Sequence, residues 1–194
     1  MYKRVLVISD LHIPYHHPNS FDFLKEIKKE YKPDFVVNIG DMLDFHAISF
    51  HTHDPDLYSA GHELKIARQY VKELESIYPE VVEVDSNHSS LVYRRGIKFG
   101  MRVADVLKVS QTMGMSAVQG HYHTKFLIQW WANPNNLFFA MNVGCLIDQK
   151  SMAFNYAKNF KTRFILGCGI IIDGVPRLLP MILDNKGKWI KKLV

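Results

Sequence analysis

The first half of the chain contains three short apolar runs rich in β-branched residues: RVLVIS (4–9), DFVVNIG (34–40) and VVEV (81–84). Continuous runs of this kind are typical of parallel strands that are covered on both faces. Two stretches with apolar residues at helical spacing lie between them, at residues 21–31 and 62–78. The succession strand, helix, strand, helix, strand predicts βαβ units and an α/β sheet.

The ends of these predicted helices carry suitable start and stop residues. Asn19 and Ser20 precede the first helix and offer side chains that can cap its free backbone N–H groups. Pro79 follows the second helix, and the residue before a proline is disfavoured in helical conformation. Both helices are therefore expected to begin and end close to these positions.

The second half of the chain is rich in strand-like segments separated by turn residues such as NPNN and DG. This half predicts a mostly antiparallel or mixed sheet, and the whole chain, residues 1–194, is interpreted as a single domain. Residues 130–131 and 138–139, two aromatic pairs, are expected in the sheet core rather than as base-stacking platforms. The segments are AVQGHYH (117–123), FLIQWWA (126–132), LFFAMNVG (137–144), RFILGCGIIID (163–173) and PRLLPMIL (176–183).

Composition places the chain among soluble globular proteins, with 47% hydrophobic and 22% charged residues. The formal charge of +5 fits an anionic partner, such as a nucleic acid or a phosphorylated substrate, although charge is weak evidence by itself. The only cysteines, Cys145 and Cys168, are expected to be reduced core thiols. The N-terminal apolar run is too short for a signal peptide and residues 164–173 are too short to span a membrane, so a cytoplasmic location is expected. The basic tail, residues 185–194, is expected to be solvated.

Polar residues follow each of the first three predicted strands at its carboxyl end. Asp10 and His12 follow the first, Asp41 the second, and the pair Asn87-His88 the third. These ends of an α/β sheet face one crevice, which is the usual position of a ligand site. A fourth group, GHYH at residues 120–123, follows the apolar AVQ and presents two alternating imidazoles. Carboxylate, imidazole and amide oxygen together form a plausible ligand set for Mn, Fe or Zn.

The ordered motifs DxH, GD, NH and GHxH, each after an apolar strand, resemble those of the calcineurin-like metallophosphoesterase family. They stand here as SDLH, IGDMLDF, SNHS and GHYH, and the surrounding SDLHIPYH, VQGHYH and GCLID look most like phage-encoded members. A phage-encoded protein would act in the host cytoplasm. The resemblance covers most of the chain and implies an α/β fold, a four-layer α/β/β/α sandwich with two mixed sheets.

The resemblance also implies roles for individual residues. Asp10, His12 and His123 would bind a first metal ion, Asn87 and His121 a second, and Asp41 would bridge the two. His88 would be the catalytic imidazole near the leaving group. The implied reaction is hydrolysis of a phosphomonoester or phosphodiester, in a phosphorylated small molecule or a nucleic acid, by metal-activated hydroxide. Mn is the metal favoured, with Fe, Zn or Ni as alternatives.

Two departures from the family pattern bear on the second metal ion. The family usually has an acidic residue after the motif histidine, where this chain has Ser89. The family also has a histidine between NH and GHxH, whereas residues 89–120 contain none. One tight and one weaker metal site are therefore expected. The alternative is a degenerate, non-catalytic metal-binding or nucleic-acid-binding protein on the same fold.

The remaining histidines and charged residues were weighed as further candidates. His51 and His53 superficially match a zinc motif of metallo-β-lactamase-like hydrolases, but Pro55 stands where that motif needs its next Asp-His pair. They remain candidates for the missing imidazole. Asp44 is expected to have a structural role in the GD loop. Arg94 and Arg95 are expected either to clamp a phosphate or to belong to a surface helix. Four further histidines are expected to be solvated: His16, His17, His46 and His62.

Overall fold

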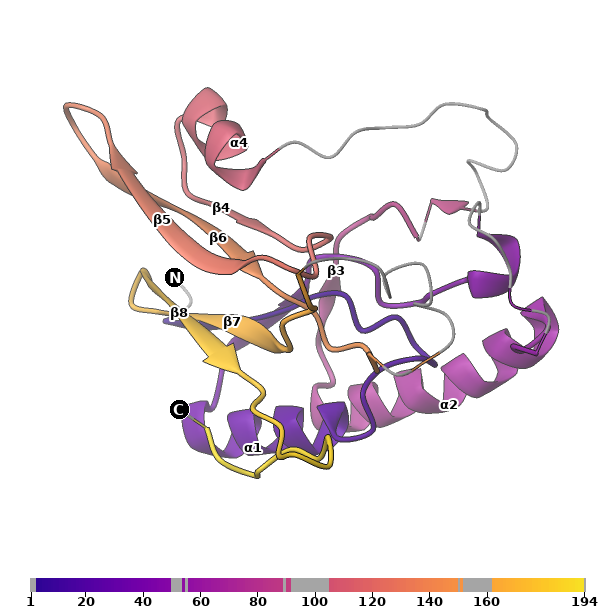
Figure 1. Cartoon of the computed structure of the whole chain (residues 1–194). Helices are drawn as coiled ribbons and strands as arrows, with labels where there is room; N and C mark the ends of the chain where they lie inside the picture. The colour runs from indigo at the N-terminus through magenta and orange to yellow at the C-terminus, as the bar shows by residue number, and fades with distance from the viewer. Residues whose placement is uncertain are drawn as a thin grey trace.

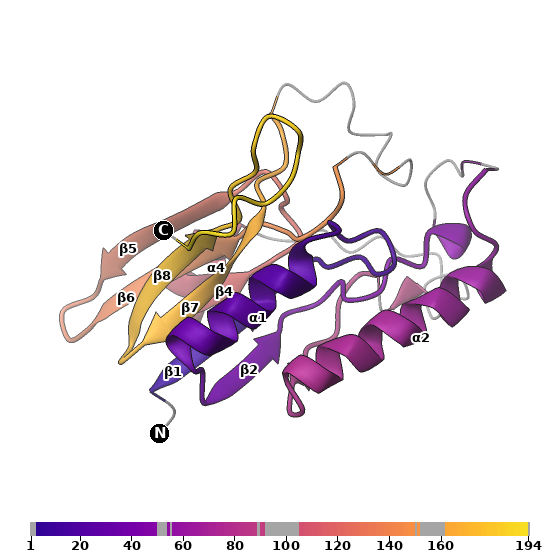
Figure 2. The same cartoon turned by 90° about the horizontal axis from the view of Figure 1, so that it is seen from below.

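The computed structural model describes residues 3–49, 54, 56–88, 90–91, 105–149, 151 and 162–193. Helices α1 (Ser20–Tyr31) and α2 (Ala60–Ile77) cover one face of a five-stranded sheet (Figures 1 and 2). A three-stranded sheet lies on the opposite face, and the short helix α4 (Val106–Met113) covers its outer side. This arrangement confirms the expected α/β/β/α order of layers.

The five-stranded sheet has the order β3-β2-β1-β7-β8 and is mixed. Its parallel part comes from the first half of the chain, β1 (Arg4–Ile8), β2 (Phe35–Asn38) and β3 (Val82–Glu83). Strands β7 (Gly167–Ile172) and β8 (Val175–Pro180) complete it, with β7 antiparallel to β1. The two last strands were expected in the second half's own sheet, but they extend the first one.

The three-stranded sheet has the order β4-β6-β5 and is also mixed. Strand β4 (Ala117–Gln119) runs parallel to β6 (Leu137–Val143), and β5 (Phe126–Ala132) runs antiparallel to β6. The segment after Gln119, which was expected to continue the strand, instead turns away. That turn carries the GHYH motif.

Alternate side chains of β1 pack into two different hydrophobic cores. Leu6 and Ile8, both fully buried, pack with the α1 residue Phe23 in the core beneath the helices. Val7 points to the other face and packs with Met141 of β6 between the two sheets. Because β1 is apolar on both faces, it is central in the layered arrangement.

Helix α4 was not predicted from the sequence. Asp105 caps it by accepting a hydrogen bond from the backbone N–H of Leu107, and Gly114 ends it in a left-handed conformation with φ of 65°. These cap residues are visible in the sequence, but the eight-residue helix between them is too short for a clear periodic signal.

Most of the described C-terminal segment is exposed as expected, but one of its residues, Trp189, packs against α1. Trp189 is 6% exposed and meets Phe23 edge-to-face, with 5.3 Å between ring centroids. The side-chain oxygen of Asn19 accepts a hydrogen bond from the Trp189 backbone N–H, so Asn19 ties down this segment and makes no side-chain cap to α1. His17 donates to the Gly187 carbonyl, and His16 is buried against Tyr70. The expectation that these two histidines are solvated is therefore wrong.

The aromatic pairs of β5 and β6 only partly form core. Phe139 is buried between the sheets, whereas Trp130, which faces it across the strands, is 50% exposed because β5 is an edge strand. Trp131 stacks on Phe138 on the other face and donates a hydrogen bond to the Ser110 hydroxyl of α4. The cysteines follow expectation, since both are buried and free of a disulfide. Among the described residues, no helix is long and apolar enough to cross a membrane.

The loops that follow β1 and β4 lie in close contact. A side-chain carbon added to Gly120 would lie 1.7 Å from the Ser9 hydroxyl oxygen and 2.3 Å from a carboxylate oxygen of Asp10. Gly120 thus allows the loop after β4 to reach the loop after β1.

Replacement of Gly120 by alanine should therefore destabilise the protein by about 1–3 kcal/mol, because the new methyl group overlaps buried polar atoms. The matched control is Gly61→Ala in the first turn of α2, where an added carbon meets nothing within 4 Å. The control should be neutral or stabilising by up to about 1 kcal/mol. Urea denaturation of both variants measures the difference, and equal stabilities would contradict this account.

Candidate metal centre

The loops after β1 and β2 are held together by backbone hydrogen bonds. The Asp10 N–H donates to the Gly40 carbonyl at 3.0 Å, and the His12 N–H donates to the Asp41 carbonyl at 2.9 Å. Asp10, His12 and Asp41 have positive φ angles of 50–52°, a left-handed conformation that is uncommon outside glycine but that Asp and His adopt more often than most residues. The two loops therefore hold three candidate ligands in the same uncommon backbone conformation.

The structure brings Asp10, His12 and His123 together in a buried cluster. Asp10 is fully buried, His12 is 1% exposed and His123 is 9% exposed. A carboxylate oxygen of Asp10 lies 2.9 Å from Nε2 of His123 and 3.8 Å from Nε2 of His12, and the two imidazole nitrogens are 3.2 Å apart. The second carboxylate oxygen of Asp41 lies 3.8 Å from Nε2 of His12.

These distances fit a single metal ion. Two atoms that each bind one ion at about 2.1 Å lie about 3 Å apart at right angles and about 4 Å apart when opposite. The spacings of 2.9–3.8 Å among Asp10, His12 and His123 fall in this range, and Asp41 adds a carboxylate oxygen 3.8 Å from Nε2 of His12. Two carboxylates and two imidazoles are a donor set that Mn, Fe and Zn all accept.

Asp44 orients the central imidazole of this cluster. Nδ1 of His12 lies 2.6 Å from a carboxylate oxygen of Asp44, which is 3% exposed. Because Nδ1 donates to Asp44, Nε2 of His12 is directed toward Asp10 and His123. Carboxylates that orient metal-binding histidines in this way fix both the tautomer and the ring position. The expected structural role of Asp44 thus extends to the site, and its position three residues after Asp41 is the sequence signal for it.

The buried carboxylates make the centre strongly attractive to positive charge. Burial alone would raise the pKa of Asp10, but hydrogen bonds with His12 and His123 bring it far below its ordinary value. Burial alone would lower the pKa of His12, but hydrogen bonds with Asp10 and Asp44 raise it to about 10. Three carboxylates, Asp10, Asp41 and Asp44, therefore surround one imidazole that gains a proton in response. A divalent cation would neutralise the same negative charge.

His88 lies beside this cluster. Its backbone N–H donates to a carboxylate oxygen of Asp41 at 3.1 Å, and its ring meets that of His12 edge-to-face at 4.5 Å between centroids. Nδ1 of His88 donates to the backbone carbonyl of Asp44. His12, Asp41 and His88 each offer an atom within 4.8 Å of the others, so His88 is also close enough to Asp41 to share an ion with it. Burial and the nearby His12 lower the pKa of His88.

Asn87 and His121 form a more open part of the site. The Asn87 side-chain oxygen is 3.1 Å from Nδ1 of His121, and His121 is exposed. Both residues, together with Asp41, line a cleft of about 460 Å³ between the ends of β3 and β4. The first cluster is therefore buried, whereas the side expected to hold the second ion faces this cleft.

The α2 residue Glu63 supports the loop that carries Asp44. Its carboxylate accepts hydrogen bonds from the backbone N–H groups of His46 and Ala47, at 3.0 and 3.2 Å. These residues belong to the single 3-10 turn η1 (His46–Ile48). His46 is 6% exposed and its Nδ1 lies 3.8 Å from Asp44, so the expectation that it is solvated is wrong, whereas His62 is exposed as expected.

Several candidates from the sequence lie outside the described residues. They are His51, His53, Pro55, Ser89, Arg94 and Arg95. The expectation that His51 or His53 completes the second metal site stays a prediction, as does the role of the two arginines. The described residues do provide a hydrogen bond that orients His88, from its Nδ1 to the Asp44 carbonyl.

Comparison with solved structures finds similar proteins of low sequence identity. Vps29 from Chaetomium thermophilum is 13% identical, with a TM-score of 0.53, over 99% of this chain and 95% of that chain. YfcE, a phosphoesterase from E. coli, is 15% identical over 98% of both chains, with a TM-score of 0.43. Vacuolar protein sorting 29 from Cryptosporidium parvum is 17% identical over 91% of this chain and 95% of that chain, with a TM-score of 0.41. No curated protein matches.

A family model gives the more specific result. The model of the calcineurin-like phosphoesterases matches residues 3–164, which include all the strand-end motifs. The narrower similarity to phage-encoded members stays a prediction. Because the match extends over most of the 194 residues, this protein belongs to the calcineurin-like phosphoesterase family.

Proposed function

We propose that this protein is a metal-dependent phosphoesterase that hydrolyses a phosphomonoester or a phosphodiester. The observation that carries the proposal is the buried cluster of Asp10, His12 and His123, with Asp41 alongside. A stable fold gains little from burying this many carboxylates and imidazoles together, whereas a metal site requires them.

In this proposal Asp10, His12, His123 and Asp41 hold a tight metal ion, and Asp41, Asn87 and His121 hold a weaker one. Mn is the favoured metal, with Fe, Zn or Ni as alternatives. When bound, the ions supply positive charge for the phosphate oxygens and activate water for attack on phosphorus. The cleft beside Asp41, Asn87 and His121 is where the organic part of the substrate enters.

His88 is proposed to act on the leaving group. Its Nδ1 donates to the Asp44 carbonyl, so Nε2 is the nitrogen that acts on the leaving oxygen, which it can protonate only in the doubly protonated form of the ring. The side chain of His88 is partly exposed, in contrast to the fully enclosed His12. Solvent and substrate can therefore reach this imidazole.

A non-catalytic metal-binding or nucleic-acid-binding protein is the second candidate. It is favoured by the missing histidine, since residues 89–120 supply no further imidazole to the weaker ion. The net charge of +5 is compatible with nucleic acid as a substrate or as a ligand. A cytoplasmic location, in the host if the protein is phage-encoded, fits either candidate.

The substitution Asp41→Asn should reduce kcat/KM at least about 100-fold, because it removes the charge shared by both proposed ions. Hydrolysis of p-nitrophenyl phosphate and bis-p-nitrophenyl phosphate with Mn²⁺ measures this. Asp22→Asn on the exposed face of α1 is the matched control and should be fully active. Activity of Asp41→Asn close to wild type would refute the assignment, and an inactive wild type that binds Mn²⁺ would favour the non-catalytic candidate.

Metal content should separate the two proposed sites. After dialysis of Mn-loaded protein, about one ion per chain should remain, and a second should bind only when Mn²⁺ is added, because its ligand set is smaller and more exposed. Elemental analysis and isothermal titration calorimetry measure the two populations. Two ions retained equally would show that another residue completes the second site.

Loss of Asp44 should weaken the tight site by about 10- to 100-fold in metal affinity, because His12 loses the partner that orients it. Asp44→Asn keeps an oxygen that can accept from Nδ1 of His12 and should be affected less than Asp44→Ala. Calorimetric titration with Mn²⁺ measures both, with Asp22→Ala as the control. Equal affinities in Asp44→Ala and wild type would show that Asp44 does not position the ligand.

A further inference from the structure

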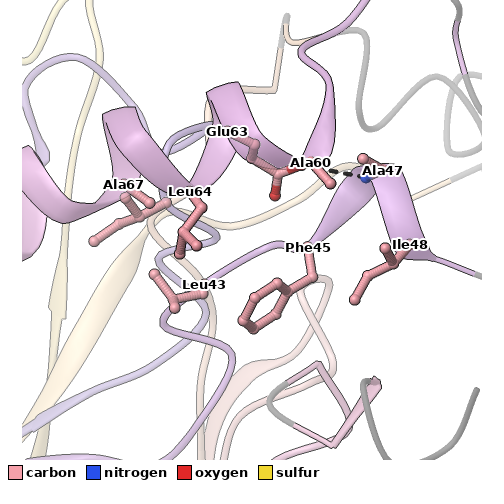
Figure 3. Close-up of a pocket in the computed structure, with 9 residues that line it drawn as sticks. Leu43, Phe45, Ala47, Ile48, Ala60, Glu63, Leu64 and Ala67 are labelled. Carbon is pink, nitrogen blue, oxygen red and sulfur yellow. Dashed lines mark hydrogen bonds between the residues drawn. The ribbon is translucent and has the colours of Figure 1, made fainter.

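A second recess lies outside the metal centre, between the η1 turn and the start of α2. Its volume is about 150 Å³, and its walls include the side chains of Leu43, Phe45, Ile48 and Leu64, which surround a common space in Figure 3. Its titratable wall residue is Glu63, whose carboxylate bonds to the backbone N–H groups of η1. The recess therefore presents an almost entirely apolar surface to a ligand.

The volume decides what size of group fits. A protein cavity of about 150 Å³ holds one benzene molecule. The recess thus matches a single large apolar side chain, such as leucine or phenylalanine, and is too small for a fatty acyl chain. A nucleic acid base has the right size, but it needs hydrogen-bonding partners on its edge, and the walls offer few.

The recess continues into a groove along α2. The two share Leu43, Leu64 and Ala67, and the groove is bordered by Lys65, Arg68 and Lys72. These three residues have helical spacing of three and four, so they form one exposed row on the helix. None of them makes an ion pair with any residue that the structure describes.

Few acidic residues border this row of three cations. Lysines and arginines on exposed helices commonly pair with acidic residues three or four positions away, as Lys25 pairs with Asp22 in α1. In the groove, Glu75 is the only acidic residue that borders it. Like charges repel in such a row, and the repulsion is relieved when acidic groups lie along it.

We propose that the recess and the cationic row form a docking site for a segment of a partner protein, which inserts one large apolar side chain and lays acidic residues along α2. Lys65 and Lys72 are seven residues apart, or about 10 Å along the helix axis. An extended segment covers that distance in about three residues. The recognised segment therefore has an apolar anchor with two or three acidic residues within the next four or so positions.

The site is distinct from the metal centre. Its walls contain none of the proposed metal ligands, and its cationic row lies on α2. Leu43 and Phe45 of the recess flank Asp44, so the two sites share a loop but no proposed ligand.

The proposal is tested by selecting random nine-residue peptides, displayed on phage, on the wild-type protein. Binders of Ala60→Leu are removed first, because a leucine at this wall position fills the recess. The expected consensus is one large apolar residue followed by aspartates or glutamates. Enriched peptides without that pattern would overturn the proposal.

The affinity of one selected peptide for a set of variants then tests the recess and the cationic row separately. Ala60→Leu and Leu64→Asp, two independent changes to the recess, should each weaken binding about tenfold or more. Reversal of Lys65, Arg68 and Lys72 to glutamate should weaken it at least as much at low salt. The matched control reverses Lys29, Lys108 and Arg177, which are exposed on other elements, and should stay within about twofold. Equal binding by the recess variants and wild type would refute the site.

Other occupants are outcomes of the same experiment. Displacement of the peptide by decanoate or by oligo(dT) at lower concentration than by free peptide would assign the site to an amphiphile or to nucleic acid instead. Self-association in sedimentation velocity that Ala60→Leu abolishes would assign it to a second copy of the chain. Thermal melting of each variant verifies that it is folded.

Discussion

The central interaction of this structure is the buried hydrogen bond between His12 and Asp44, at 2.6 Å. It joins the loop after β1 to the loop after β2 and turns Nε2 of His12 toward Asp10 and His123. Three carboxylates lie within this small volume, so the arrangement is unfavourable unless positive charge enters it. The raised pKa of His12 shows that a positive charge is favoured at this position, and a divalent cation supplies more positive charge than one proton. Stability and metal binding are therefore linked in the same few residues.

The two sheets converge on this interaction. Strand β1 is the common element, because its alternate residues pack under the helices and against the second sheet. The loops at its carboxyl end and at that of β4 meet at Gly120, where no side chain can be accommodated. His123 thus reaches Asp10 from the second sheet. The layered fold brings together ligands that lie more than a hundred residues apart in sequence.

The loop that carries Asp44 also connects the metal centre to the outer surface. Glu63 of α2 holds the η1 turn through two backbone hydrogen bonds, and the side chains of Leu43 and Phe45, which flank Asp44, line the recess beside α2. One side of this loop therefore supports the buried imidazole, while the other side is available to a partner. Under the two proposals, one short segment supports both a catalytic and a docking surface.

The local pattern of residues was sufficient to predict the strands, the two long helices and the strand-end motifs, because each depends on residues close together in the sequence. Short-range signals also identified Asp10, His12, Asp41, Asn87, His121 and His123 as candidate ligands. Their assembly, the joining of β7 and β8 to the first sheet, and the burial of His16, His17, His46 and Trp189 depend on long-range packing. The orienting role of Asp44 also depends on long-range packing. A carboxylate three residues after Asp41 acquires its meaning only when folding brings it to His12, thirty-two residues away.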